Sequence, residues 1–240
     1  MITNLTIHAN FRIDGKSLPS IDEQYTDLWR LGKHFESIGI DFSHWYPPAA
    51  TQEASRLNRA FDEDGVTTAA LALAKSDPTN RDGDMRSLGV WNGIDEEGGM
   101  VFTTLLSASI IPSNFNLIAS QNEPLQGWRN VLSTVQKVIE IWKPMLVGVN
   151  PHGYQSVFKD RPSVGWMLYL PFVVKTEDLP IAPVLVPVMK EKKQQGTIIV
   201  SVSETFDVKN SEHTKRAHDI EIMLVDKDML PTRTEFMRKF

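Results

Sequence analysis

Two runs of three consecutive acidic residues are the first places in the sequence where chemistry could occur. Asp62-Glu63-Asp64 and Asp95-Glu96-Glu97 each offer the pair of carboxylates that general acid–base catalysis uses. Both runs stand beside glycine in segments typical of turns, where consecutive side chains point in different directions and stay solvated. Neither run alternates its oxygen ligands as a calcium-binding loop does. We therefore interpret both runs as exposed acidic turns without a catalytic role.

Three further patterns come close to a known chemical motif. Gly148 and Gly153 have the glycine spacing of a phosphate-binding loop, but Tyr154 stands where that loop needs a lysine. Ser156 and Lys159 are spaced like a serine activated by a lysine one helical turn away, yet no partner motif follows them. The six histidines are not spaced as metal ligands, and the chain has no cysteine. The sequence thus predicts no catalytic, cofactor-binding or metal-binding set.

Charge is distributed unevenly along the chain. The 240 residues include 25 Lys and Arg against 30 Asp and Glu. The part that ends at Asn122 has 9 basic and 16 acidic residues, a net charge of −7, whereas the remainder has 16 and 14, a net charge of +2. An acidic first half disfavours direct binding to nucleic acid and suits a basic protein partner.

Neither a membrane nor an export pathway is indicated by the apolar stretches. The most apolar one, residues 181–189, is interrupted by Pro183 and Pro187 and is far shorter than the roughly 20 residues that span a bilayer. Residues 1–8 lack the basic start and the continuous apolar run of an export signal. The absence of cysteine fits a reducing compartment. We therefore predict a cytoplasmic protein that does not insert into membranes.

Aromatic residues near the acidic turns suggest a protein-binding surface. Trp45 and Tyr46 precede two prolines, at a corner where partial exposure is expected, and Trp91 closes a strand-like run shortly before the second acidic turn. Exposed aromatic rings anchor protein interfaces, and carboxylates steer a basic partner toward them. We predict that the partner is bound by Trp45, Tyr46, Asp62, Glu63, Asp64, Trp91, Asp95, Glu96 and Glu97.

Hydrophobic periodicity predicts the elements that position these residues, beginning with a strand and a helix. Residues 5–13 alternate between apolar and polar, as expected of a strand with one buried and one solvated face. Ser20 and Glu23 have the spacing of a capping box, which predicts a helix that begins there and ends at Gly39.

The rest of the first half is predicted to contain short elements. Helical patterns over residues 53–61 and 67–75 flank the first acidic turn. Strand-like runs follow at 85–92, 100–108 and 114–119, separated by turn residues, and they predict an antiparallel meander.

The second half opens with the clearest helical pattern of the chain. Apolar residues from Trp128 to Trp142 recur at steps of three and four, and Pro144 ends the pattern. Beyond it we predict strands at 145–149, 164–170, 184–190 and 197–203, the last two joined through 192–196, and a helix at 211–226.

Groups of strands followed by single helices indicate the α+β class. We predict a mostly antiparallel sheet with helices packed on one face. No linker of low complexity divides the chain, so we expect one compact domain over residues 1–240, with possible sub-halves at 1–122 and 123–240.

Three stretches of the sequence resemble the immunity protein 52 family. They are the strand ending in Gly89-Val90-Trp91-Asn92-Gly93, the strand Gly165-Trp166-Met167-Leu168-Tyr169-Leu170-Pro171, and the unit that runs from Gly196-Thr197 through Glu204-Thr205-Phe206-Asp207 into a helix with His213 and Ala217. The family consists of antitoxins encoded beside polymorphic toxins that type VI secretion delivers.

The resemblance implies a cytoplasmic, non-enzymatic immunity protein that neutralises one cognate effector toxin by stoichiometric binding. In this family the toxin is usually a nuclease of the restriction-endonuclease-like class. The family supplies no catalytic residues to transfer, so the contact residues named above rest on charge and aromatic character alone.

Two other functions remain open at this point. One is a cytoplasmic hydrolase or sugar-modifying enzyme whose carboxylates are scattered in the sequence and meet only in the fold, and the other is a non-enzymatic adaptor. The sequence also leaves open whether a toxin inhibitor would cover the active site, trap an inactive assembly or block self-association of the toxin.

Overall fold

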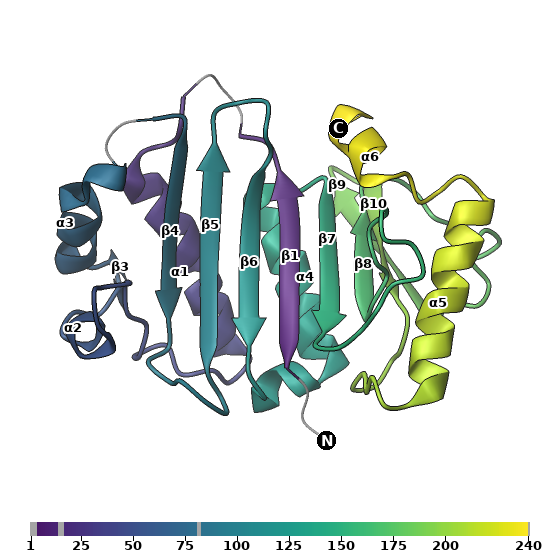
Figure 1. The fold of residues 1–240 in the computed structure, drawn as a ribbon, viewed down its shortest axis with the longest axis horizontal. Coiled ribbons are helices and arrows are strands. Elements are labelled where there is room, and N and C mark those ends of the chain that lie inside the picture. Colours follow the sequence, from purple (N-terminus) through teal and green to yellow (C-terminus); the bar gives the residue numbers. More distant parts are fainter. Residues whose placement is uncertain (1–3, 14–16, 81–82, 240) are drawn as a thin grey trace.

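An antiparallel sheet of eight strands runs through both halves of the chain (Figure 1). The computed structural model describes residues 4–13, 17–80 and 83–239. In spatial order the strands are β4 (Met85–Trp91), β5 (Met100–Ser107), β6 (Ser113–Ala119), β1 (Leu5–Phe11), β7 (Leu146–Pro151), β8 (Met167–Leu170), β10 (Lys193–Val200) and β9 (Val184–Lys190). With six helices beside this sheet in the described residues, the predicted α+β class is confirmed.

The first strand of the chain, β1, lies in the middle of the sheet. It pairs with β6 on one side, where Ile7 faces Leu117, and with β7 on the other, where Ile7 faces Val149. Its burial alternates along its whole length, as the sequence predicted, although the strand ends at Phe11 and not at Ile13. The predicted meander is also confirmed, because β4, β5 and β6 pair in sequence order.

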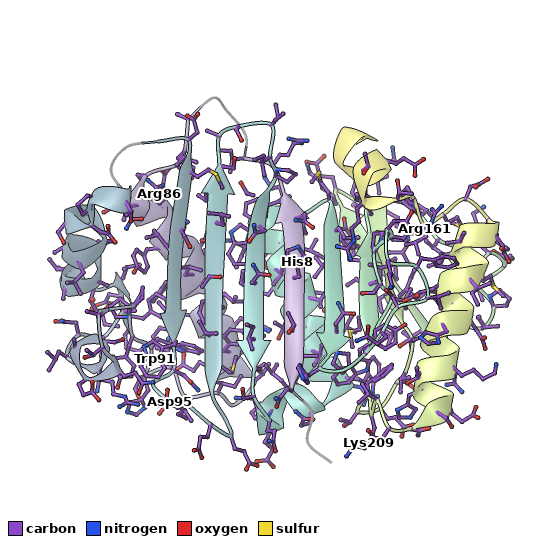
Figure 2. All side chains as sticks on the ribbon, in the orientation of Figure 1. His8, Arg86, Trp91, Asp95, Arg161 and Lys209 are labelled. Atoms are coloured by element: carbon purple, nitrogen blue, oxygen red, sulfur yellow. The ribbon has the colours of Figure 1, made fainter. Side chains whose placement is uncertain are left out.

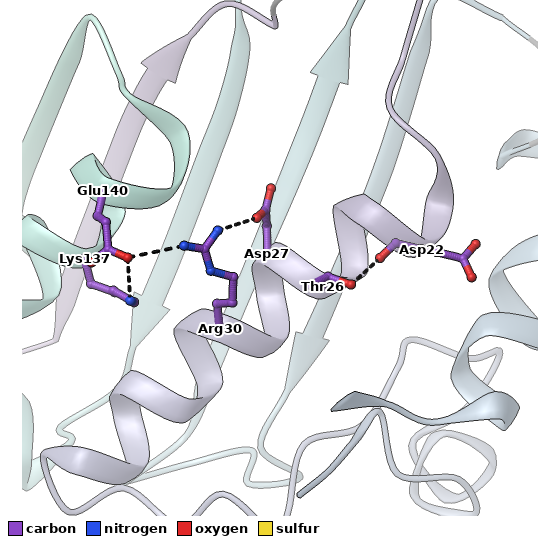
Figure 3. A network of polar contacts seen from close by, with 6 residues as sticks. All are labelled: Asp22, Thr26, Asp27, Arg30, Lys137 and Glu140. Atoms are coloured by element: carbon purple, nitrogen blue, oxygen red, sulfur yellow. Dashed lines mark hydrogen bonds and ion pairs between the residues drawn. The ribbon is translucent and has the colours of Figure 1, made fainter. Parts of the chain in front are cut away.

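Two long helices, α1 (Ile21–Ser37) and α4 (Trp128–Trp142), cover one face of the sheet (Figure 1). The capping box that opens α1 is confirmed, since Ser20 Oγ accepts a hydrogen bond from the Glu23 N–H and Glu23 accepts one from the Ser20 N–H. On the outer surface of this layer, Arg30 of α1 contacts Glu140 of α4 at 3.3 Å (Figure 3). Such an exposed pair contributes little, so burial of the apolar stripes holds the helices in place.

Shorter elements surround the edge strand β4. They are α2 (Gln52–Arg56), the hairpin of β2 (Phe61–Asp62) and β3 (Gly65–Val66), α3 (Thr68–Ser76) and a 3-10 turn at Pro78–Asn80, with a second such turn at Glu123–Gln126 before α4. Helices α2 and α3 were both predicted from the sequence, but α2 is shorter than expected. The hairpin around the first acidic turn was not predicted.

The two C-terminal helices, α5 (Ser211–Asp226) and α6 (Arg233–Lys239), show that one feature of the predicted architecture was wrong. They pack on the face of β7, β8 and β10 that is opposite to α1 and α4, so the helices do not share one face (Figure 1). Ile220 and Leu224 of α5 form a second core with Leu168 of β8 and Ile199 of β10. The residues next to these on the strands, Met167 and Ile198, belong to the first core on the other face of the sheet. A strand that is buried on both faces has no alternation to reveal which face a helix covers. The sequence predicted α5 but not α6.

A buried carboxylate fixes the segment that follows β7. Glu221 on α5 accepts hydrogen bonds from the Tyr154 hydroxyl at 2.8 Å, from the Val157 N–H at 2.7 Å and from the Val164 N–H at 2.9 Å. Burial, together with the adjacent carboxylate, raises the pKa of the Tyr154 hydroxyl. Residues 152–164 are therefore tied to α5 rather than left as a loose connection.

The β9–β10 hairpin forms the far edge of the sheet. Glu191 and Lys192 both adopt positive φ, 48° and 68°, as a tight two-residue hairpin turn requires. The connection is therefore shorter than the predicted 192–196, and β10 already begins at Lys193. Pro187 lies within β9, the outermost strand, where a missing N–H is tolerated.

We predict that Trp142→Ala lowers the free energy of unfolding by about 3–5 kcal/mol, because the buried ring leaves a cavity when it is removed. Trp142 stacks on Phe115 with ring centroids 4.6 Å apart. Trp128→Ala, at the half-buried start of the same helix, serves as the control and should cost less. Guanidinium unfolding measures both variants, and equal midpoints for wild type and Trp142→Ala would contradict the assignment.

Candidate partner-binding site

A cluster of aromatic and charged side chains lies at the end of β4, where the chain turns toward β5. The backbones of Tyr46 and Trp91 form an antiparallel bridge, with N–H to carbonyl distances of 2.8 and 3.1 Å. The two rings lie 6.4 Å apart and are half-buried. Figure 2 labels Trp91 and Asp95 at this end of the sheet.

Helix α2 holds the Trp91 ring from one side. Ser55 Oγ accepts a hydrogen bond from Trp91 Nε1 at 2.6 Å and donates one to the Pro47 carbonyl at 2.5 Å. The Arg56 guanidinium stands over the Trp91 ring, 5.1 Å from its centroid, at a distance that permits a cation–π interaction.

Asp95 connects the second acidic turn to the same helix. It accepts a hydrogen bond from Gln52 at 2.6 Å and lies 3.4 Å from Arg56, which also donates to the Gly93 carbonyl. The turn itself is shaped by the buried Asn92, whose side chain accepts from the Met100 N–H. We call Tyr46, Arg56, Trp91 and Asp95 the Trp91 ridge.

A pocket lies on each side of the Trp91 ridge. One, of about 440 Å³, is lined by residues that include Asp41, His44, Tyr46, Arg56, Asn122 and Glu123. The other, of about 450 Å³, is lined by residues that include Gln52, Ser55, Gly89, Trp91, Asp95 and Thr103. In the first pocket, hydrogen bonds from the Ser43 side chain and backbone, with His44 nearby, lower the pKa of Asp41 to about 2. This pocket therefore keeps a carboxylate charged at any physiological pH.

The structure separates the two predicted acidic turns. Asp95, Glu96 and Glu97 are exposed beside the Trp91 ridge. Asp62, Glu63 and Asp64 are also exposed, but they form the β2–β3 turn, which packs against α1. There Trp29 Nε1 donates to the Asp62 carbonyl and Lys33 lies 2.8 Å from Glu63.

The predicted partial exposure of Trp45 was wrong. Its side chain is 1% exposed, stacked on Phe35 at 5.9 Å and edge-on to Phe102 at 4.8 Å. Neighbouring residues of an extended segment point to opposite sides, so the corner can present only one of Trp45 and Tyr46 to solvent. Tyr46 is the one presented.

Sequence reasoning missed three residues of α2 that contact Trp91 or Asp95: Gln52, Ser55 and Arg56, the last of which belongs to the ridge itself. A signal for them was present, because Thr51 is a suitable N-cap and Gln52 and Arg56 are four residues apart, hence on one helical face. What the sequence could not show was that this face meets the end of β4.

Two other properties of the described part of the chain are relevant to function. No three His, Asp or Glu side chains among residues 4–13, 17–80 and 83–239 are grouped so that they could hold a metal ion. Within the same ranges, no helix has the length and apolar character needed to cross a membrane.

A profile of the immunity protein 52 family matches residues 26–233. The chain belongs to this family. No curated protein sequence matches it. Among solved structures, Pseudomonas aeruginosa T6SS protein PA0821 is similar in fold, with a TM-score of 0.49 and 9% identity over 90% of this chain and 73% of that one.

Within the immunity protein 52 fold, two of the three stretches that suggested the family are structural. Trp166 is buried and its Nε1 donates to the Val202 carbonyl. His213 is buried at the start of α5 and contacts Glu204 at 3.0 Å. Only the stretch that contains Trp91 reaches the candidate site.

We predict that Ser55→Ala destabilises this immunity protein by about 1–3 kcal/mol, because it removes the partner of Trp91 Nε1 and of the Pro47 carbonyl. Asp95→Ala removes an exposed ion pair and should cost less than about 1 kcal/mol. Urea unfolding of both variants tests the order. If Asp95→Ala were the more costly change, charge rather than the buried hydroxyl would hold α2 against β4.

Proposed function

We propose that this immunity protein binds and neutralises a cognate type VI secretion effector toxin by stoichiometric protein–protein contact, without catalysing a reaction. The observation that carries the proposal is membership of the immunity protein 52 family over residues 26–233. We further propose that the protein acts in the cytoplasm, where an incoming toxin would reach its target.

The proposed toxin is a nuclease of the restriction-endonuclease-like class. An enzyme that cuts DNA must present a basic surface to the phosphate backbone. Up to Asn122 the immunity protein carries a net charge of −7, and the exposed 95–97 turn places part of that charge beside the half-buried Tyr46 and Trp91 rings. Charge complementarity with an aromatic anchor close by supports a nuclease as the partner.

Co-expression tests the proposal directly. We expect the chain to protect cells that produce the effector toxin encoded by the adjacent gene, and the two purified proteins to form a complex of fixed stoichiometry with loss of nuclease activity. The purified chain alone should show no turnover on nucleic acid, ester, phosphate or glycoside substrates. Turnover that survives repurification and disappears with a single Asp, Glu or Ser substitution would favour the hydrolase alternative.

The acidic turn beside the ridge should control how fast the toxin associates. Because exposed charges act through a field screened over about 8–10 Å, Asp95→Asn, Glu96→Gln and Glu97→Gln together should slow association and flatten its salt dependence. Dissociation should change little. Surface plasmon resonance at low and high salt measures both rates.

The β2–β3 turn provides a control of matched charge for this experiment. Asp62→Asn, Glu63→Gln and Asp64→Asn remove the same three charges beside α1, so we expect a smaller effect on association. Equal slowing by both triple variants would mean that the net charge of the protein, and not the turn beside Trp91, steers the toxin.

A further inference from the structure

One face of the meander and of β1 is not covered by a helix of the described chain. Helices α1 and α4 lie behind the sheet in Figure 1, and α5 and α6 cover only the region of β7, β8 and β10. We call the uncovered surface the open face. Its side chains form three rows across β4, β5, β6 and β1: Trp91, Val101, Ile118 and Thr6; Gly89, Thr103, Asn116 and His8; Ser87, Leu105, Asn114 and Asn10.

The open face has no formally charged residue. None of its twelve positions is Asp, Glu, Lys or Arg, although at the chain average of 23% charged residues about three would be expected. Depletion of charge at the centre of a surface that includes an aromatic ring distinguishes the core of a protein interface from ordinary surface.

Four polar residues of the open face are already held by one another. His8 contacts Asn116 at 2.6 Å and Asn10 at 3.0 Å, and Asn116 donates to Asn114 at 2.9 Å. Figure 2 labels His8 near the middle of this surface. Side chains that are held in place before contact lose less conformational freedom when a partner covers them.

Exposed apolar side chains gather around the same strands. Of the twelve large apolar residues that are exposed in the described chain, five belong to residues 85–119, which form β4, β5, β6 and their connections. They are Met85, Ile94, Ile110, Ile111 and Ile118. Ile110 is 89% exposed at the tip of the β5–β6 connection, and Ile118 is 50% exposed on the open face itself.

The open face is continuous with the Trp91 ridge. Trp91 belongs to both, and the pocket of about 450 Å³ lies between α2 and the open face, where it is lined by Gly89, Val101 and Thr103. The acidic 95–97 turn stands at the end of this surface. By contrast, the hollow of about 650 Å³ between α4 and the β9–β10 hairpin is lined by two lysines, Lys143 and Lys190, against one carboxylate, Glu140, so its charge is less suited to a basic partner.

We propose that the cognate toxin docks across the open face, with the Trp91 ridge as one border of the interface. This inference rests on the proposed function. The occupant is a folded toxin domain whose binding surface has two parts. Its uncharged, partly apolar centre covers Ile118 and Thr103, and its basic flank meets the 95–97 turn. Pairing of a toxin strand with β9 is disfavoured by Pro187, which removes one of the donors that an added strand would use.

The test places a charge in the open face and the same charge elsewhere. Ile118→Lys and Thr103→Lys should each weaken affinity for a catalytically inactive form of the adjacent gene's toxin by at least about tenfold, mostly through faster dissociation. Leu73→Lys on α3 and Ile222→Lys on α5 are matched controls, because these residues are 42% and 41% exposed. Both controls should stay within about twofold of wild type.

The outcomes separate the two proposals. If the wild-type chain does not bind this toxin, the proposed function fails. If it binds and all four variants bind equally well, the open face is not the interface, while the proposed function stands. Thermal unfolding identifies a variant that fails to fold, and the other open-face variant then carries the test.

A second copy of the chain is the competing occupant. Analytical ultracentrifugation of the protein without toxin shows whether it is a monomer or a dimer. If the wild type is a dimer that Ile118→Lys dissociates without changing toxin affinity, the open face joins two copies and the inference is overturned. A monomer whose toxin affinity falls with both open-face variants supports it.

Discussion

The alternation of side chains along β1 is the constraint on which the rest of the structure depends. Leu5, Ile7, Ala9 and Phe11 point into the core beneath α1 and α4, and the residues between them point to the open face. Because β1 pairs on both sides, a slip of one residue would turn every apolar side chain of the central strand toward solvent. Its register therefore fixes which face receives the helices and which face remains free, and it joins the two halves of the chain into one sheet.

Much of the fold was predictable because its signals are local. Alternation predicted β1, and strand-like runs separated by turn residues predicted the meander. The Ser20–Glu23 spacing predicted the start of α1, and the apolar stripe ending at Trp142 predicted α4. The placement of α5 on the opposite face was not predictable in this way, because β7, β8 and the second half of β10 are buried on both sides and lack alternation. Likewise, nothing near residues 5–11 indicates that they lie at the centre of the sheet.

Only those parts of the candidate site that have a local signal in the sequence were predicted. The acidic 95–97 turn, Tyr46 and Trp91 were selected by residue type, and the structure places them together. The predicted exposure of Trp45 was wrong because packing decides which residue of an extended corner faces the core, and Trp45 packs against Phe35 and Phe102. Ser55 and Arg56 were missed because their partners lie 36 and 37 or more residues away, on β4 and the turn after it.

The proline in β9 has a consequence for the protein before it meets any partner. An unpaired edge strand with exposed apolar residues is where folded chains begin to aggregate, and Met189 makes β9 such an edge. Pro187 interrupts its row of donors, and Lys190, Lys192 and Lys193 outnumber Glu191 at the hairpin tip, which leaves it positively charged. Two copies that approached edge to edge through β9 would lack a hydrogen bond at Pro187. We expect this edge to keep the folded protein dispersed at high concentration.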